Sequence, residues 1–244
     1  MSYRLHIPQT LQQAVQIKKE TDGTYLAAGT DILVNHRHKD DLIALEKIPG
    51  LSSIEEDRDF VRIGSLVTFD QLEKSSVVKD RLPALWQAAF NTAGPQIRNR
   101  ATIGGNIGCF SPASDSVTAL LALDAQLELF DGKAYREKLE NLHYLDNGAI
   151  ITAILVPKRF CFSAFEKVGK RNAMSVSVIN MALARNGSEV RIAAGCVGPQ
   201  VILCTDPSKV LESILPINDR WGTIEYRKTV ARNLLEKLTK EAGL

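Results

Sequence analysis

The sequence predicts an α+β protein, and three observations lead to this fold class. In the first sixty-odd residues, short apolar runs typical of strands mix with helix-capping patterns, without a regular βαβ repeat. The β-branched run 150–156 stops at Pro157, where we expect the first unit to end. Beyond it the apolar runs lengthen and meet at Asn186-Gly187, which predicts an antiparallel sheet with helices packed on one face.

The first unit opens with a helix. Thr10 and Gln13 form the T-x-x-Q pattern of a capped helix, which should end near Asp22-Gly23. The signals that follow predict buried strands at 24–28 and 42–45, with a short helix at 31–34 between them. A hairpin with an acidic turn should follow at 53–64, and a second capped helix should begin after Thr68.

The middle of the chain contains the most unusual stretch. Residues 82–93 carry apolar positions at helical spacing and end at Gly94-Pro95. The next residues, 94–115, hold four glycines and two prolines, so we expect a long irregular loop, and such loops inside compact domains are usually functional. Ser114 or Asp115 can cap a helix over 117–123, and a strand should follow at 125–130.

The second unit should be a smaller α+β module. Its predicted elements are three strands and two helices, at 162–168, 176–185, 189–196, 208–214 and 217–241. We place the boundary between the two units near Pro157.

Composition limits the class of partner. Lys+Arg 30 against Asp+Glu 28 gives a net charge of +2, too small to favour nucleic acid or an anionic membrane as the main partner. No apolar run reaches the roughly 18 residues of a membrane span, and the first ten residues do not resemble a secretory signal. We therefore expect a cytoplasmic protein whose partner is a small molecule or another protein.

The cysteine and histidine patterns predict no metal centre in this chain. The four cysteines are too scattered for an iron–sulfur motif, and the four histidines lack the spacing of a zinc site. No nucleophile, general acid or general base stands out either, so we predict no catalytic side chain. This fits a protein in which a cofactor performs the chemistry.

Two glycine-bearing turns are the candidate binding elements. They are Ala27-Ala28-Gly29-Thr30-Asp31 and Thr102-Ile103-Gly104-Gly105-Asn106. Neither matches a Rossmann or P-loop motif, but consecutive glycines at positive φ let backbone N–H groups approach a phosphate, and two threonine hydroxyls can add donors. The alternative for each turn is a tight turn without a ligand. Asp115 has two interpretations as well: it could accept hydrogen bonds from a ribose diol, or cap the helix that follows.

At these residues the sequence resembles the FAD-binding medium subunits of the molybdenum hydroxylases, such as xanthine dehydrogenase and carbon monoxide dehydrogenase. The first turn resembles the family's A-G-G-T-D segment, with Ala28 where a second glycine is common. The run 102–107 and Ser111-Pro112-Ala113-Ser114-Asp115 resemble its T-I-G-G-N-I and S-P-x-x-D segments. Further likeness lies in 165–173 and 191–199, so the resemblance covers nearly the whole chain.

The resemblance implies a fold and its cofactor. It implies non-covalent FAD in a fold of the vanillyl-alcohol-oxidase (PCMH) type, as an FAD-binding domain over 1–157 with subdomains of roughly 1–50 and 51–157. A C-terminal domain, 158–244, would follow. By the same resemblance the pyrophosphate would be held by Leu26, Ala27, Ala28, Gly29, Thr30 and Asp31, together with Thr102, Ile103, Gly104, Gly105 and Asn106. The neighbouring Ile32 and Ala101 would also bind the cofactor.

The resemblance also assigns the two ends of the cofactor. Asp115 would hold the adenosine ribose, with Ser111 and Ser114 lining the same loop. Lys167, with Lys170 and Ile151 as further candidates, would lie near the flavin ring.

The function implied is electron transfer. A partner subunit with two [2Fe–2S] clusters and a molybdopterin-binding large subunit would deliver electrons to FAD, which would pass them to NAD⁺ or another acceptor, with xanthine dehydrogenase as the expected complex. Two alternatives stay open: a self-contained FAD-linked oxidase of the same fold, and a non-catalytic nucleotide-binding assembly module.

Overall fold

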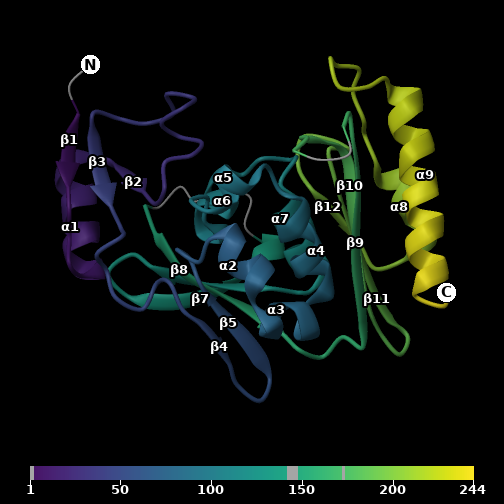
Figure 1. Cartoon of the computed structure of the whole chain (residues 1–244), viewed down its shortest axis with the longest axis horizontal. Helices are drawn as coiled ribbons and strands as arrows, with labels where there is room; N and C mark the ends of the chain where they lie inside the picture. Colours follow the sequence, from purple (N-terminus) through teal and green to yellow (C-terminus); the bar gives the residue numbers. More distant parts are fainter. Residues whose placement is uncertain (1–2, 142–147, 172–173) are drawn as a thin grey trace.

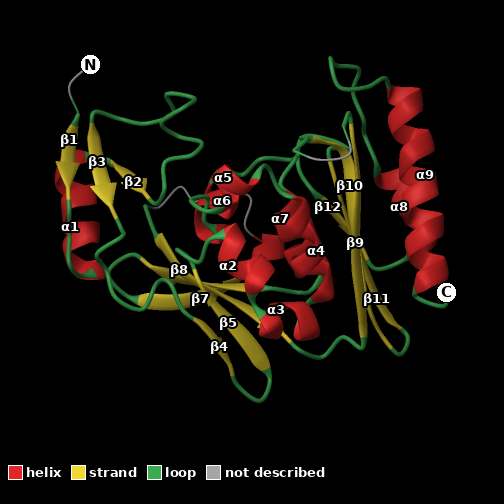
Figure 2. Cartoon of the chain, in the orientation of Figure 1, coloured by secondary structure: helices red, strands yellow, loops and turns green. Residues whose placement is uncertain are grey.

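The computed structural model describes residues 3–141, 148–171 and 174–244 and confirms the mixture of helices and strands. Its strands form three sheets, with helices between and outside them (Figures 1 and 2). Among these described residues, no helix is long and apolar enough to cross a membrane.

The N-terminal sheet is parallel and has three strands in the order β1-β3-β2. Its strands are β1 (Arg4–His6), β2 (Thr24–Leu26) and β3 (Asp41–Ala44), and α1 (Leu11–Thr21) connects the first two. The predicted cap of α1 is confirmed, because the Thr10 side chain accepts a hydrogen bond from the Gln13 N–H. The helix expected at 31–34 is wrong: this segment forms consecutive turns, since its apolar residues Leu33 and Val34 are exposed and do not make a buried helical face.

The central sheet is antiparallel, with the strand order β4-β5-β8-β6-β7. The predicted hairpin is confirmed, and the β-branched run lies buried in the middle of the sheet as β8. The strand β7 was not predicted, because its alternation has few apolar residues. The five strands are β4 (Ile54–Glu56), β5 (Phe60–Gly64), β6 (Gln126–Phe130), β7 (Ala134–Lys138) and β8 (Ile150–Pro157), and the 3₁₀ helix η1 (Leu139–Asn141) follows β7.

A group of helices lies between the central and C-terminal sheets (Figure 2). They are α2 (Phe69–Lys74), α3 (Ser76–Arg81), α4 (Pro83–Asn91), α5 (Pro95–Arg98), α6 (Ile103–Gly108) and α7 (Asp115–Ala122). The capping box at Thr68 is confirmed. The long irregular loop expected at 94–115 is wrong, because it contains α5 and α6. These helices have four and six residues, too short for apolar periodicity to reveal them.

The C-terminal sheet is antiparallel, in the order β12-β11-β10-β9. Its elements are β9 (Phe162–Gly169), β10 (Ser177–Asn186), β11 (Glu189–Gly195), β12 (Ile202–Cys204), the 3₁₀ helix η2 (Pro207–Lys209), α8 (Val210–Ser213) and α9 (Ile224–Glu241). The Asn186-Gly187 hairpin is confirmed, with Gly187 at φ 58°. The last helix begins at Ile224 and not near Ile217 as expected.

The sheet carries helices on both faces, so the expectation of a single covered face is wrong. One face of β10 presents Met181 and Leu183 to the core that contains α9. The opposite face presents Ala182 and Ala184 to the core that contains α4 and α7 (Figure 1). The first unit therefore shares a hydrophobic core with the second. A single-sequence pattern could not show this, because both faces of a doubly covered strand are apolar.

The central strand β8 should dominate the stability of the first unit. Ile154 is fully buried in the core that joins the central sheet to the helices. We expect Ile154→Ala to lower the free energy of unfolding by about 2–5 kcal/mol through lost burial and a residual cavity. Urea denaturation measures this change. Leu215→Ala, at a side chain that is 70% exposed, is the control and should change stability by less than about 0.5 kcal/mol.

Candidate cofactor-binding site

A pocket of about 820 Å³ is lined by residues of all three sheets, among them Tyr25 of β2, Ile150 of β8 and Ser177 of β10. Three groups of residues line it: the first glycine turn, the segment from Thr92 to Asp115, and the residues around β8 and the start of β10. All of the predicted site residues line it except Leu26, Ile103, Lys167 and the further candidate Lys170. The two glycine turns, which are seventy residues apart in the sequence, therefore share one cavity.

The first turn presents backbone N–H groups. None of the described residues accepts a hydrogen bond from the N–H groups of Ala28 to Ile32. Gly29 has φ 72°, and a Cβ there would lie 2.5 Å from Leu33 Cδ1, so both the backbone and the packing require glycine. A run of unpaired N–H groups beside a pocket is a typical anion-binding element.

The second turn is the start of a helix, which corrects its predicted geometry. Thr102 is the N-cap of α6 and its side chain accepts from the Gly105 N–H. Gly104 donates its own N–H to Ser65 O at 2.8 Å, and neither glycine has positive φ. The expectation of positive φ at both glycines is wrong. Gly104 is needed for close packing, because a Cβ there would lie 2.5 Å from Ser65 Cβ.

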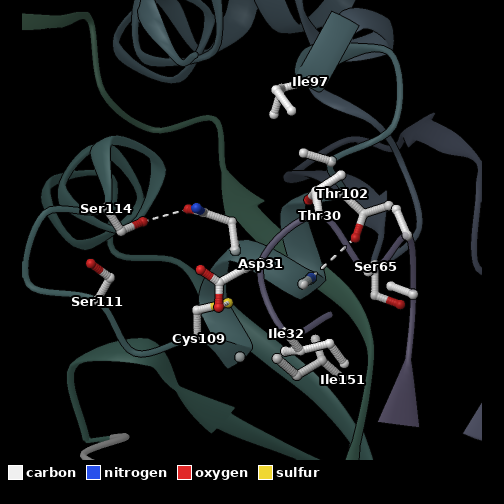
Figure 3. A pocket seen from close by; sticks show the side chains of 18 of the residues that line it. Thr30, Asp31, Ile32, Ser65, Ile97, Thr102, Cys109, Ser111, Ser114 and Ile151 are labelled. Atoms are coloured by element: carbon white, nitrogen blue, oxygen red, sulfur yellow. Dashed lines mark hydrogen bonds between the residues drawn. The ribbon is translucent and has the colours of Figure 1, made fainter. Parts of the chain in front are cut away.

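The two turns face each other. A Cβ built on Gly105 would lie 3.8 Å from the Cβ of Ala27, so the start of α6 and the first turn are in contact range. Asn106 fixes the next segment, because its Oδ1 accepts from Ser116 Oγ at 2.6 Å and from the Ser114 hydroxyl (Figure 3). The segment between α6 and α7 is therefore held against the second turn.

Asp115 lies in a buried polar network. Its Oδ1 accepts from Ser177 Oγ and Asn180 Nδ2, both at 2.6 Å, and its Oδ2 accepts from Lys167 Nζ at 2.7 Å. Ser114, not Asp115, is the N-cap of α7, so the capping alternative for Asp115 is wrong. Asp115 still lines the pocket, and its contact with a ribose stays a prediction.

Lys167 connects three parts of the pocket wall. Besides Asp115, its ammonium group donates to Asn91 O at 2.7 Å and Ser175 O at 3.1 Å. Its three N–H hydrogens therefore all have acceptors within the protein. Ser175 lines the pocket and Asn91 precedes Thr92, which also lines it, so Lys167 holds two segments of the wall in place.

Sequence reasoning missed several lining residues. Tyr25 donates its hydroxyl to Gly148 O at 3.0 Å, and burial raises its pKa to about 12. Cys109 lies 3.5 Å from Asp31 Oδ2, and burial, followed by the Asp31 charge, raises the pKa of its thiol to about 12. Ser65 is buried, and its Oγ has no partner among the described residues. No local pattern marks these residues, because only the folded chain brings them to the pocket.

The comparisons with known proteins identify the family. Residues 1–159 match the family described as the FAD binding domain in molybdopterin dehydrogenase. The chain belongs to this family. The predicted cofactor, FAD, and the predicted class, an FAD-dependent oxidoreductase component, are thereby confirmed.

Relatives in this family match most of the chain. The xanthine dehydrogenase FAD-binding subunit of Escherichia coli O157:H7 is 31% identical, over 97% of this chain and 94% of that protein. The nicotinate dehydrogenase FAD-subunit of Eubacterium barkeri is 29% identical, over 80% of this chain and 75% of that protein. A chain of the carbon monoxide dehydrogenase from Hydrogenophaga pseudoflava superposes with a TM-score of 0.89, 23% identity, and coverage of 98% of this chain and 96% of that chain. At that identity the likeness shows the shared fold alone.

The residues present fit FAD. The N–H run of the first turn suits a diphosphate, and the cavity lies within the size range of cofactor pockets, about 300–1,000 Å³. Three apolar side chains also line the pocket while remaining well exposed: Ile97, Met174 and Val176, at 44%, 55% and 52%. Exposed apolar side chains in a pocket provide the surface that a flat aromatic ring needs.

Gly104 should not tolerate a side chain. We expect Gly104→Ala to lower the free energy of unfolding by about 1–3 kcal/mol, because the new Cβ would overlap Ser65. Gly108→Ala, in the same helix with nothing within 4 Å of the new Cβ, is the matched control. It should leave stability unchanged or raise it slightly. Urea unfolding of both proteins makes the comparison, and equal losses would contradict the packing role of Gly104.

The Lys167–Asp115 pair should be strongly coupled. Both side chains are buried, at 11% and 7% exposure, so we expect Lys167→Met to cost about 3–5 kcal/mol of stability. A double-mutant cycle with Asp115→Asn should give a coupling energy of about 1–3 kcal/mol. The exposed pair Lys74–Asp70 is the control and should couple by less than about 0.5 kcal/mol. A similar coupling energy for both pairs would show that burial does not strengthen the Lys167–Asp115 interaction.

Proposed function

We propose that this chain is the FAD-binding electron-transfer subunit of a molybdenum hydroxylase complex. The observation that carries the proposal is the run of unpaired N–H groups from Ala28 to Ile32, facing the start of α6 across one pocket. Such an arrangement suits the diphosphate of a dinucleotide bound between two parts of the chain. The proposed fold type is that of vanillyl-alcohol oxidase (PCMH), with subdomains 1–50 and 51–157 and a C-terminal domain 158–244.

We assign the site residues to three parts of the cofactor: the diphosphate, the adenosine ribose and the flavin ring. The first turn holds the diphosphate through its N–H groups, and the start of α6 forms the wall beside it, since Ala27 and Gly105 lie in contact range. Asp115, with Ser111 and Ser114, holds the adenosine ribose, which requires the ribose to share the Asp115 carboxylate with its present donors. Ile151 and Lys167 lie toward the flavin ring, with Lys167 acting through the wall segments that it holds.

Bound FAD supplies the redox chemistry, because it can accept and release electrons one or two at a time. The residues of this chain bind it non-covalently, orient it and exclude water from one side. The lining side chains suit this role, because the raised pKa values of Tyr25 and Cys109 keep both groups neutral at ordinary pH. These two side chains therefore add no charge to the part of the wall that they form.

The proposed partners follow from the family. They are an iron–sulfur subunit with two [2Fe–2S] clusters and a molybdopterin-binding large subunit, with NAD⁺ or another acceptor taking electrons from FAD. Relatives are named for xanthine and for nicotinate dehydrogenases. We propose xanthine dehydrogenase as the complex, because that relative is 31% identical over 97% of this chain, against 29% over 80% for the nicotinate dehydrogenase subunit. We place the complex in the cytoplasm, a reducing compartment that suits four unpaired cysteines.

Two measurements test this function. Chromophore released by heating the purified chain should gain fluorescence after phosphodiesterase treatment, as FAD does when it is cleaved. Xanthine should then leave the flavin of the isolated chain oxidised and should reduce it when the partner subunits are present. Rapid reduction of the isolated chain by an organic substrate would indicate the self-contained oxidase instead. Absence of flavin, even after incubation with FAD, would indicate the assembly module.

A further inference from the structure

A bound diphosphate needs positive charge near it, and the residues assigned to the site so far do not supply that charge. Four of them line the pocket: Lys18, Asp31, Arg37 and Asp115. Asp115 is neutralised by Lys167 from outside the lining, and Lys18 is bound to Asp22 at 3.3 Å and to Gly23 O at 2.9 Å. Arg37 is the lining cation whose side chain has no hydrogen-bond acceptor among the described residues.

Backbone geometry ties Arg37 to the first turn. Its N–H donates to Ile32 O at 2.9 Å, directly after the run of unpaired N–H groups. His36, just before it, has φ 52°, a left-handed conformation, and Arg37 itself lines the pocket. The guanidinium is therefore carried by the same loop that presents the N–H groups.

The Arg37 side chain is free to take a ligand. Its nearest charged neighbour is Asp31, with Nη1 and Oδ2 3.6 Å apart, longer than a direct hydrogen bond. Asp31 is already held by Asn35 Nδ2 at 2.9 Å and by the Cys109 thiol. Asp31 therefore keeps two donors of its own when Arg37 turns to a ligand. The Arg37 side chain is 63% exposed, so its ion pair with Asp31 contributes little free energy that turning away would lose.

We infer that Arg37 is a diphosphate-binding residue, one that the two glycine turns do not include. Its planar guanidinium can donate two parallel hydrogen bonds to phosphate oxygens while the N–H groups of 28–32 bind the same anion. The inference rests on the proposed function, because it assigns a further residue to that same site. It also explains how a site whose wall carries Asp31 accepts an anion: Arg37 offsets that carboxylate.

The inference is tested by measuring the dissociation constant of FAD for the apoprotein and its variants. We expect Arg37→Gln to weaken FAD binding about tenfold at low ionic strength, and Arg37→Lys, which keeps the charge but loses the planar fork, to weaken it less. Arg58→Gln is the matched control: it removes the same charge from an exposed arginine at the β4–β5 turn, outside the pocket lining, and should bind FAD as the unmodified chain does.

Two further readouts separate a phosphate contact from a structural effect. ADP, which has a diphosphate, should lose affinity with Arg37→Gln as FAD does, whereas riboflavin, which has no phosphate, should not. The difference in FAD affinity between Arg37→Gln and Arg58→Gln should also shrink at about 0.5 M salt, because salt screens exposed charges.

Three results would overturn the inference. They are equal FAD dissociation constants for Arg37→Gln and Arg58→Gln, an equal loss of riboflavin binding, and a difference that salt does not change. Each of these can occur while the unmodified chain binds FAD, so the proposed function would stand. Failure of the unmodified chain to bind FAD would overturn the proposed function and this inference together.

Discussion

A buried carboxylate must receive hydrogen bonds or positive charge, and in this chain Asp115 receives both from the other half of the molecule. Asp115 is the first residue of α7, whereas Lys167, Ser177 and Asn180 lie on β9 and β10. Desolvation makes each of these groups depend on the others. Because Lys167 also donates to the backbone carbonyls of Asn91 and Ser175, which lie at the pocket wall or next to it, the same network that joins the two units shapes the pocket.

The two turns differ in how their backbone N–H groups are used. The first turn leaves its N–H groups unpaired and relies on glycine at positive φ. The second uses the N–H groups of Ile103, Gly104 and Gly105 within the protein, on Val67 O, Ser65 O and the Thr102 side chain. Its glycines serve close approach: α6 lies directly on Ser65, and Gly105 leaves space opposite Ala27. The second turn therefore positions the wall, and the first turn offers the donors.

Apolar packing explains how this fold can be kept at low sequence identity. The likeness to the carbon monoxide dehydrogenase chain reaches a TM-score of 0.89 at 23% identity. A core accepts many apolar residues of suitable volume, so most of its sequence can change while the arrangement of the backbone stays the same. Charged residues on the pocket wall, such as Arg37, are then free to adjust how the anion is held.

The sequence by itself determined the α+β class, the capped helices at Thr10 and Thr68, the hairpins, and the family, because these depend on local periodicity, turn chemistry and contiguous motifs. It also named the two turns that line one pocket. Tertiary structure alone decided that α5 and α6 are helices, since hydrogen bonds to Ser65 and Val67 from outside hold the start of α6. It alone decided the partners of Asp115 and the pocket positions of Ser65 and Arg37. These depend on approaches between residues far apart in the chain, which no local pattern encodes.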